Sequence, residues 1–282
     1  MAVCWKPPGS FALNSLKVSA LMYPAPALFI ASLSSQQLTS AVHTIANAAP
    51  QVIFEDDELL VVDKPGGMVC HSAQRPEHTS LAEWLREHGV PTPRMINRLD
   101  RETSGLVVVA KNESAAKTLG KAVLRREIEK EYIAICQGEF TEESGVIDQP
   151  IGVSETSVVY TKRMVDGASG QPSLTRFAIE KRLRHFTVVR LMPRTGRAHQ
   201  LRVHMAWLGH PIVGDKVYGP DETLYLQFIE QGVTTEMLEK LLLPRHALHA
   251  ERVSFLHPRT QQPCAFQARL PDDMRVFIEE NL

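Results

Sequence analysis

Asp100 lies in a setting that suggests catalysis. It stands between Arg98 and Arg101 in residues 97–106, where a polar loop leads into an apolar run. Flanking arginines favour the charged form of a carboxylate, and loops held on a rigid sheet often carry catalytic side chains. Such a carboxylate can act as a nucleophile or as a general base. Taken alone, however, the segment is more simply explained as a surface loop of ion pairs.

A predicted helix over residues 197–208 could supply a partner for this carboxylate. Leu201 and Met205 form the apolar face of that helix, and Arg202 lies near the edge of the same face. A guanidinium in that place requires an anion, because an unpaired buried charge costs several kcal/mol. Asp100 is one candidate for that anion. Asp215, further along, is interpreted as part of a structural turn.

Charge is unevenly distributed along the chain. The formal net charge is -1, which by itself argues against binding to nucleic acid. Residues 181–204, however, contain seven lysines and arginines and no acidic residue. A local cationic strip of this kind can bind phosphate groups even when the whole protein is nearly neutral. A solvated charged face is the alternative explanation.

Several classes of site are disfavoured by the sequence. The four cysteines are scattered without a C-x-x-C pair, and His199 and His204 lack metal-ligand spacing. No glycine-rich loop for nucleotide phosphates occurs. We therefore predict no metal and no cofactor. The apolar stretch at residues 25–33 is far shorter than the ~20 residues of a membrane span, so no membrane association is predicted.

Residues 1–50 differ from the rest of the chain. They contain Lys6 and Lys17 but no acidic residue, and they are rich in Ala, Ser, Leu and Pro. We predict a poorly structured extension here, followed by a folded domain over residues 51–282. An organellar targeting sequence is the alternative, although such a sequence would contain more arginine. The expected protein is cytoplasmic and of bacterial type.

Strand signals outnumber helix signals after residue 51. The patterns predict helices over residues 80–89, 112–125, 197–208, 236–242 and 275–280. They predict strands over residues 52–54, 59–62, 105–110, 132–136, 158–162, 173–183, 186–192, 248–255 and 264–269. Because the strands follow one another in hairpin-like succession, we expect an α+β domain with a mixed or antiparallel sheet.

Four segments in order resemble the RluA-type RNA pseudouridine synthases. Residues 98–106 look like the catalytic motif of that family, and residues 196–204 look like its second signature. Residues 64–67 before His71, and residues 130–134, match two further family stretches. A chance match to four ordered motifs is very improbable, whereas any one short piece would be weak evidence.

The resemblance, which extends from about residue 51 to the C-terminus, implies an α+β fold. Its core would be a mixed, largely antiparallel β-sheet with a central RNA-binding cleft. Asp100 corresponds to the essential carboxylate, Arg202 to the arginine paired with it, and Tyr132 to the active-site tyrosine. Arg98 would assist extrusion of the target base, and Leu248 would pack in the site. The other residues expected to contact RNA are Arg101, Arg197, His199 and Gln200.

Two departures from the family pattern stand out. Asn97 occupies the position where the family usually has histidine, and it cannot carry a proton as imidazolium does. We expect altered positioning or RNA contacts from this change, with activity retained. The small basic RNA-binding domain that many relatives carry at the N-terminus is also missing from residues 1–50. Substrate choice would then depend on the catalytic domain.

The expected function is isomerisation of specific uridines in ribosomal or transfer RNA to pseudouridine by a monomer. The reaction needs no redox cofactor or energy donor, and the sequence does not decide between attack on the sugar and abstraction of a sugar proton. A nucleoside deaminase is disfavoured because its zinc ligands are absent. A glycosidase would need a second carboxylate, for which only Glu102 is near Asp100. A non-catalytic RNA-binding protein with the same fold is the remaining alternative.

Overall fold

The computed structural model describes residues 48–71 and 80–282, and all elements lie in these ranges. The helices are α2 (Leu81–Glu87), α3 (Glu113–Leu124), α4 (Gln200–Trp207), α5 (Thr223–Gln231), α6 (Thr235–Leu241) and α7 (Asp272–Glu280). The strands are β1 (Gln51–Glu55), β2 (Leu59–Lys64), β3 (Arg94–Met95), β4 (Ser104–Ala110), β5 (Glu129–Gln137), β6 (Ser144–Asp148), β7 (Ile151–Val153), β8 (Arg163–Val165), β9 (Leu174–Arg182), β10 (Phe186–Pro193), β11 (Leu248–Leu256) and β12 (Pro263–Gln267).

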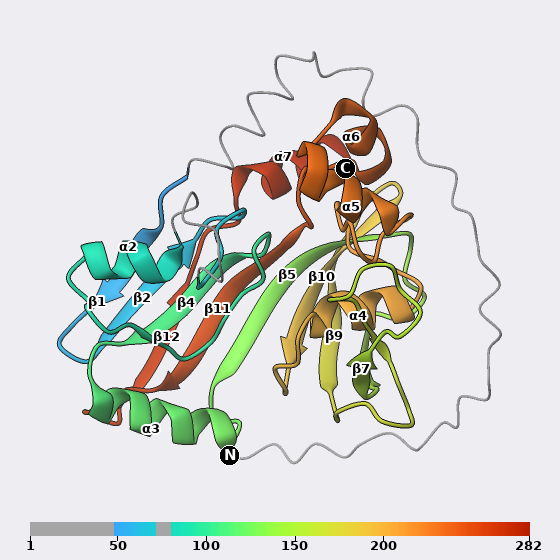
Figure 1. The fold of residues 1–282 in the computed structure, drawn as a ribbon. Coiled ribbons are helices and arrows are strands. Elements are labelled where there is room, and N and C mark those ends of the chain that lie inside the picture. The colour runs from blue at the N-terminus through green and yellow to red at the C-terminus, as the bar shows by residue number, and fades with distance from the viewer. Residues whose placement is uncertain (1–47, 72–79) are drawn as a thin grey trace.

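The strands of the described residues form one large sheet and one small one. The large sheet has ten strands in the order β1-β2-β4-β11-β5-β10-β9-β6, with β12 on β11 and β3 on β4, while β7 and β8 pair separately. In the large sheet β4 and β11 are parallel, and the other pairs are antiparallel. Figure 1 shows β5 and β11 between a half that carries α2 and α3 and a half that carries α4. The expected mixed, largely antiparallel α+β fold is confirmed.

Residues 59–62 of β2 and 105–110 of β4 form continuous apolar runs because both faces of these strands are covered. Alternate residues of a strand point to opposite faces. One set, including Leu60 and Val107, packs in the large central core together with Leu85 of α2. The other set, including Leu59, packs in a second core together with Leu119 of α3. The continuous runs of valine and leucine therefore mark strands buried between two helices.

Gly105 permits the close approach of β4 to β11. It pairs with Ala250 in the parallel register, and its φ of +112° is a conformation that other residues rarely adopt. A Cβ atom at this position would overlap the backbone of Ala250. The loop that carries Asp100 leads directly into this strand, so the end of the loop is fixed against the centre of the sheet.

Local signals fixed the ends of two helices. The Ser80 side chain accepts a hydrogen bond from the Glu83 backbone N–H, and the Glu83 carboxylate accepts one from the Ser80 N–H, which is the predicted capping box of α2. Asn112 caps α3 through its side-chain oxygen, which accepts from the Ala115 N–H at 2.9 Å. Both helices are confirmed, and the strand predicted at residues 105–110 is confirmed as β4.

Other predictions were wrong or incomplete. The strand predicted at residues 158–162 is a turn, and the pairing segment is β8, which follows it. The helix predicted from Arg197 begins at Gln200, because His199 adopts a left-handed conformation with φ of +56°. Ala198 therefore precedes the helix. The elements β3, β6, β7 and α5 were not predicted.

The prediction for residues 1–50 falls almost wholly outside the described part of the chain. Within the described ranges, no helix is both long and apolar enough to cross a lipid bilayer.

Candidate active site

The loop between β3 and β4 places Asp100 at the surface of the central core. Leu99 is buried, and its backbone exchanges two hydrogen bonds of 3.4 Å with the Cys70 thiol: the Leu99 N–H donates to Sγ, and the thiol donates to the Leu99 carbonyl. The next residue, Asp100, keeps 32% of its side chain exposed. An anchored residue immediately before it therefore aims the carboxylate outward.

A buried lysine, Lys64, also holds the Asp100 loop in place. The Lys64 ammonium group is fully buried and donates to the backbone carbonyls of Pro65 at 2.8 Å, Met68 at 2.9 Å and Arg101 at 3.3 Å. The Gly67 N–H also donates to the Arg101 carbonyl, at 2.8 Å. Burial lowers the pKa of Lys64 to about 8. The Lys-Pro-Gly-Gly turn thus holds the Asp100 loop in place through hydrogen bonds to the Arg101 carbonyl.

Arg202 joins Asp100 to a second carboxylate. Its Nη1 donates to Asp100 Oδ2 at 3.0 Å, while Nε and Nη2 donate to Asp215 at 2.6 Å and 2.8 Å. Arg202 is buried, as predicted for a residue at the edge of the apolar face, and Asp215 is completely buried. The bidentate partner of the guanidinium is therefore Asp215, and Asp100 accepts one further N–H.

Asp215 is both the turn residue that was predicted and a member of this charge network. Its Oδ1 accepts from the backbone N–H groups of Val217 at 2.9 Å and Tyr218 at 3.0 Å. Burial alone would raise the pKa of Asp215, but the Arg202 guanidinium and these N–H groups hold that pKa well below its usual range. The inner ion pair therefore remains charged across the physiological pH range.

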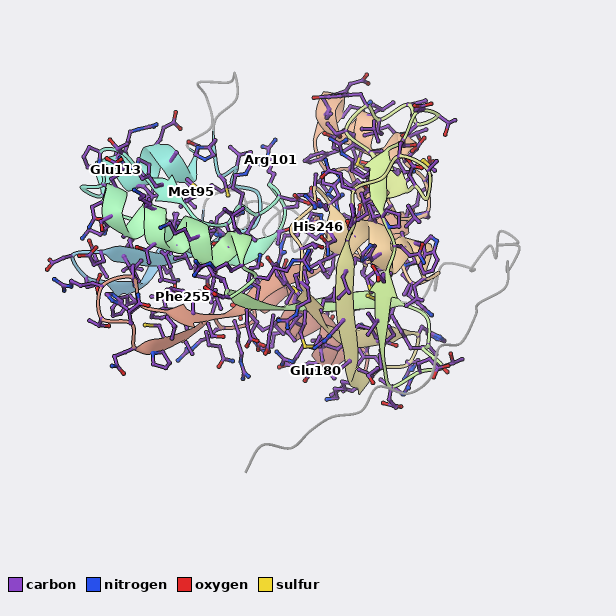
Figure 2. The ribbon with its side chains drawn as sticks, turned by 90° about the horizontal axis from the view of Figure 1, so that it is seen from below. Met95, Arg101, Glu113, Glu180, His246 and Phe255 are labelled. Carbon is purple, nitrogen blue, oxygen red and sulfur yellow. The ribbon has the colours of Figure 1, made fainter. Side chains whose placement is uncertain are left out.

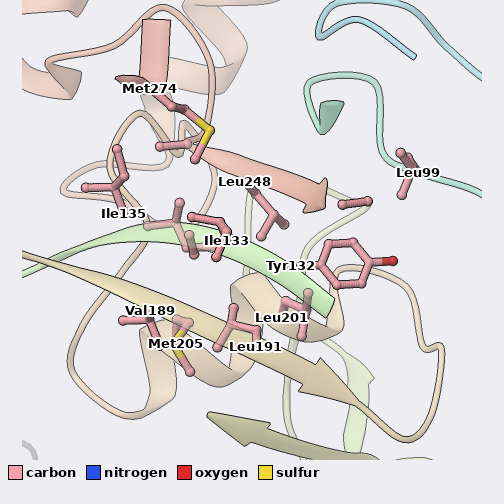
Figure 3. Close-up of a cluster of buried hydrophobic side chains, with 14 of the residues drawn as sticks. Leu99, Tyr132, Ile133, Ile135, Val189, Leu191, Leu201, Met205, Leu248 and Met274 are labelled. Carbon is pink, nitrogen blue, oxygen red and sulfur yellow. The ribbon is translucent and has the colours of Figure 1, made fainter. Parts of the chain in front are cut away.

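Tyr132 and Leu248 form an apolar floor beside the ion pair. Tyr132 on β5 is 8% exposed and Leu248 on β11 is 4% exposed, and both belong to the central core. Figure 3 shows the Tyr132 ring at the edge of this core with its hydroxyl pointing away from the other apolar side chains. Burial, together with the charge of Asp100, raises the pKa of Tyr132 above its ordinary value, so the phenol remains protonated at neutral pH.

These residues line a cleft of about 590 Å³. Every site residue that was predicted from the sequence contributes to its walls: Arg98, Asp100, Arg101, Tyr132, Arg197, His199, Gln200, Arg202 and Leu248. Arg98, Arg101 and Arg197 are exposed. Figure 2 shows Arg101 between the half of the molecule with α3 and the half with α4. The cleft thus combines an apolar floor, a carboxylate and a cationic rim.

His199 lies in the cleft wall at the start of α4. Its Nδ1 is 2.8 Å from the Tyr218 hydroxyl, and that hydroxyl accepts a hydrogen bond from the Arg163 backbone N–H. Burial and the Arg202 charge lower the pKa of His199. The arrangement fits a neutral ring whose Nδ1 accepts from Tyr218 and whose Nε2 carries the hydrogen. In this form the second ring nitrogen of His199 is a hydrogen-bond donor.

Gln200 has little capacity left for RNA, contrary to its predicted role. It is buried, its Oε1 accepts from Thr195 Oγ1 and the Arg197 N–H, and its Nε2 donates to the Leu174 carbonyl and Thr175 Oγ1. All four hydrogen bonds that a glutamine amide commonly makes are used within the protein. This geometry argues against an RNA contact and gives Gln200 the task of shaping the Arg197 loop.

Asn97 has a structural task that the sequence did not reveal. Its Nδ2 donates to the Leu106 carbonyl at 3.0 Å, and its Oδ1 accepts from the Val108 N–H at 2.9 Å. The side-chain amide thus pairs with β4 as another strand would. Asn97 therefore fixes the approach of the Asp100 loop to β4.

The sequence also missed an ion pair next to the site. The Lys216 ammonium donates to Glu102 Oε1 at 2.6 Å, and His246 Nδ1 lies 3.5 Å from Glu102 Oε2. Lys216 and His246 are buried. The adjacent residues Asp215 and Lys216 thus hold Arg202 and Glu102 respectively. The signal available in the sequence was a lysine directly after the Gly-Asp pair, but neither its burial nor its partner could be read from it.

No cluster of three or more His, Cys, Asp or Glu side chains able to hold a metal occurs among residues 48–71 and 80–282.

Comparisons with known proteins identify the family of this chain. A family model described as RNA pseudouridylate synthase matches residues 58–207. A ribosomal large subunit pseudouridine synthase D of Nitrosomonas europaea is 34% identical over 243 residues, covering 83% of this chain and 66% of the relative. One from Vibrio cholerae is 38% identical over 231 residues, covering 79% of this chain and 68% of the relative. This chain thus spans about two thirds of the length of these relatives.

A solved structure, that of human RNA pseudouridylate synthase domain containing 1, aligns with a TM-score of 0.61 at 28% identity over 78% of this chain and 83% of that chain. The family model and the solved structure both describe RNA pseudouridylate synthases, which are enzymes that act on RNA. The chain belongs to the RNA pseudouridylate synthase family, whose members are isomerases that convert uridine to pseudouridine in RNA.

Proposed function

We propose that this protein converts specific uridines of ribosomal RNA to pseudouridine, with Asp100 as the catalytic carboxylate acting on a flipped-out base. The observation that carries the proposal is the contact between Asp100 Oδ2 and Arg202 Nη1, 3.0 Å long, beside the apolar floor of the cleft. Ribosomal RNA is favoured because the relatives named above are ribosomal large subunit pseudouridine synthases. Transfer RNA is the second candidate substrate.

The reaction breaks one bond and forms another within the same nucleotide. The bond from uracil N1 to ribose C1′ is cleaved, the base turns, and C5 bonds to C1′ before the proton on C5 is lost and N1 gains one. Asp100 can attack C1′ and later leave, or it can remove a ribose proton and return it. Either route restores the carboxylate, so no other reactant is consumed.

Neighbouring residues limit what each group does. Arg202 holds Asp100 in place, and because Asp215 already balances the guanidinium, Asp100 is not buried in a closed ion pair. Tyr132 offers a ring face for the uracil and, because its phenol remains protonated, a hydrogen-bond donor. Arg98 is exposed at the cleft rim, where a flat cation could fill the stack that the flipped base has left.

The test uses ribosomal and transfer RNA transcripts labelled with tritium at uracil C5. The parent protein should release tritium without added nucleotide, and Asp100→Asn should release none above background. Asp272→Asn, which changes an exposed aspartate on α7, is the matched control and should equal the parent. Equal release by the parent and Asp100→Asn would refute the role of Asp100. Tight RNA binding without release by the parent would favour a non-catalytic RNA-binding protein.

A further inference from the structure

A second cavity, of about 550 Å³, adjoins the cleft. The two share the lining residues Asp100, Arg101, His199 and Arg202. The remaining walls of the second cavity come mainly from α5 and from the turn at Lys216, and we call it the α5 cavity. None of the chemistry described above uses it.

We propose that the α5 cavity binds the base of the nucleotide next to the target uridine in the same RNA strand, and so reads the sequence beside the target. The proposal rests on the proposed function, because the position of the target ribose at Asp100 sets where the neighbouring nucleotide lies. A nucleotide on one side of that ribose is a single phosphate link away. The shared wall at Asp100 is the point where the cleft and the α5 cavity meet.

One wall of the α5 cavity suits a stacked base. Tyr225, Phe228 and Ile229 of α5 line it together with Val217. Ile229 is 50% exposed, and its position on the helix leaves it open to a ligand. Proteins that read single-stranded RNA commonly stack unpaired bases on aromatic and apolar side chains. The apolar wall of the α5 cavity is therefore better suited to contact with an RNA base than to contact with water.

The charges of the α5 cavity favour a base attached to an anionic backbone. Its lining has three cationic side chains, Arg101, Arg202 and Lys216, and two carboxylates, Asp100 and Glu102. Lys216 is already bound to Glu102 and to the Pro244 carbonyl. Lys216 is therefore not free to bind a phosphate, but the exposed Arg101 can hold the phosphate of a nucleotide whose base lies inside the cavity.

His246 offers a ring nitrogen to the base edge. It lines the α5 cavity, and among the described residues its Nδ1 is a buried nitrogen without a hydrogen-bond partner. The nearest carboxylate oxygen, from Glu102, is 3.5 Å away. Buried polar atoms are nearly always hydrogen-bonded, directly or through water. A base edge, or a water held by it, would complete this one.

The test blocks the α5 cavity and leaves the catalytic groups unchanged. Ile229→Trp adds bulk to the lining of the cavity, and Leu226→Trp is the matched control, because Leu226 is a 38% exposed aliphatic residue on the same helix that does not line the cavity. The probe is a pool of synthetic RNA hairpins, each with one loop uridine between two randomised nucleotides. Pseudouridine in each member is read by sequencing after chemical derivatisation. Ribosomal RNA transcripts are tested in parallel. Once a modified uridine has been mapped in them, a second pool is made in which the two nucleotides beside that uridine are randomised.

We expect the parent and Leu226→Trp to share a preference for certain bases on one side of the uridine. Ile229→Trp should lose this preference and modify the preferred RNAs about tenfold more slowly, as the loss of one stacked base would predict. An RNA with an abasic site at that position should be modified at the same rate by all three proteins. Ile229→Asp, which makes the same wall polar, should behave like Ile229→Trp and is the second variant if Trp disturbs folding.

Ile229→Trp and Ile229→Asp with the parent's rate and base preference would overturn the proposal and leave the proposed function intact. A parent with no preference at either neighbouring position would overturn it equally. A parent that forms no pseudouridine in any of these RNAs would instead refute the proposed function, and the proposal would fall with it.

Discussion

Arg202 makes unequal contacts with two carboxylates. The fully buried Asp215 takes two of its N–H groups, and the partly exposed Asp100 takes one. Asp215 thus balances the charge of the buried guanidinium from within the protein. Asp100 keeps an open side from which its carboxylate can reach a ribose. Because Asp215 neutralises the guanidinium, Asp100 can be held by Arg202 and still react with a substrate.

Removal of the Asp215 charge should weaken both folding and catalysis. In Asp215→Asn the guanidinium of Arg202 loses its bidentate anion and is drawn toward Asp100. Breaking a buried ion pair from one side commonly costs about 3–5 kcal/mol. Urea unfolding should show a loss of that size, and kcat should fall. A loss below about 1 kcal/mol would contradict the assignment of Asp215 as the main partner of Arg202.

The Tyr132 phenol should not ionise in alkaline solution that leaves the protein folded. Burial and the neighbouring Asp100 charge raise its pKa above the ordinary value near 10. Ultraviolet difference spectra between pH 8 and pH 11 should therefore be the same for the parent and Tyr132→Phe, because Tyr132 contributes no phenolate signal. A smaller phenolate absorbance change in Tyr132→Phe than in the parent would mean that the Tyr132 phenol ionises in this range and that water reaches it, which would contradict its burial.

At the scale of elements, some features could be predicted from the sequence because their causes are local. Ser80 and Glu83 begin α2, and Asn112 begins α3, through contacts within three residues. The start of α4 was misplaced because His199 adopts a left-handed conformation, in which its ring contacts Tyr218 in another part of the chain. Propensity and periodicity carry no information about such a contact.

The candidate site shows the same division. The burial of Arg202 followed from its helical position, and a resemblance to known enzymes named Asp100 as its partner. The sharing of Arg202 with Asp215, and the Glu102–Lys216 pair beside it, depend on how the turn after β10 and α4 meets the Asp100 loop. A loop-to-turn contact of this kind is a property of the folded chain and has no periodic signal.

The Glu102–Lys216 pair should position the Asp100 loop without contacting the reacting atoms. Glu102→Gln removes the charge from a contact of 2.6 Å that ties the loop to the Asp215 turn. Small misplacements of a catalytic group lower the rate steeply. We expect kcat to fall about tenfold with KM within twofold of the parent, measured under multiple turnover. Glu113→Gln, an exposed glutamate of α3, is the control. A rise in KM alone would contradict a positioning role.

Strand β2 contributes a pH dependence of folding through Asp63. Burial raises the pKa of Asp63 to about 6, against the opposing charges of Lys64 and Arg245. The folded protein therefore binds this proton more tightly than the unfolded chain, so stability falls as pH rises from about 4 to about 6 and stays lower above that window.

Asp63→Asn should remove this loss. After allowance for solvent screening of a partly exposed group, we expect the variant to be about 1 kcal/mol more stable than the parent at pH 7. At pH 4 the difference should be smaller, because the parent carboxyl is then mostly protonated when folded. Urea unfolding at both pH values measures the two differences. Identical differences at pH 4 and pH 7 would contradict the raised pKa.

At the scale of the whole molecule, a nearly neutral protein presents a cationic cleft. The formal net charge is -1, yet Arg98, Arg101 and Arg197 are all exposed on the cleft walls. The central strands β5 and β11 carry the apolar floor, and loops from both halves of the molecule supply the charged rim (Figure 1). Binding to RNA should therefore depend on a few phosphate contacts gathered at one place.

The salt dependence of RNA binding tests this arrangement. Each phosphate contact that is lost should reduce the slope of log affinity against log salt by about 1. We expect Arg98→Gln and Arg197→Gln each to give that reduction in a filter-binding titration over several salt concentrations. Arg275→Gln, which changes an exposed arginine of α7 away from the cleft, should keep the parent's slope. Equal slopes for all four proteins would place the RNA on another surface.

The most direct measurement is a structure of Asp100→Asn bound to an RNA fragment that contains the mapped target uridine. The substitution should leave the uridine unconverted in its bound position. The account predicts that the residue 100 side chain lies within about 3.5 Å of the target ribose C1′, with the flipped uracil against the Tyr132 ring. A uridine that remains stacked in the RNA, or that is bound away from residue 100, would contradict it.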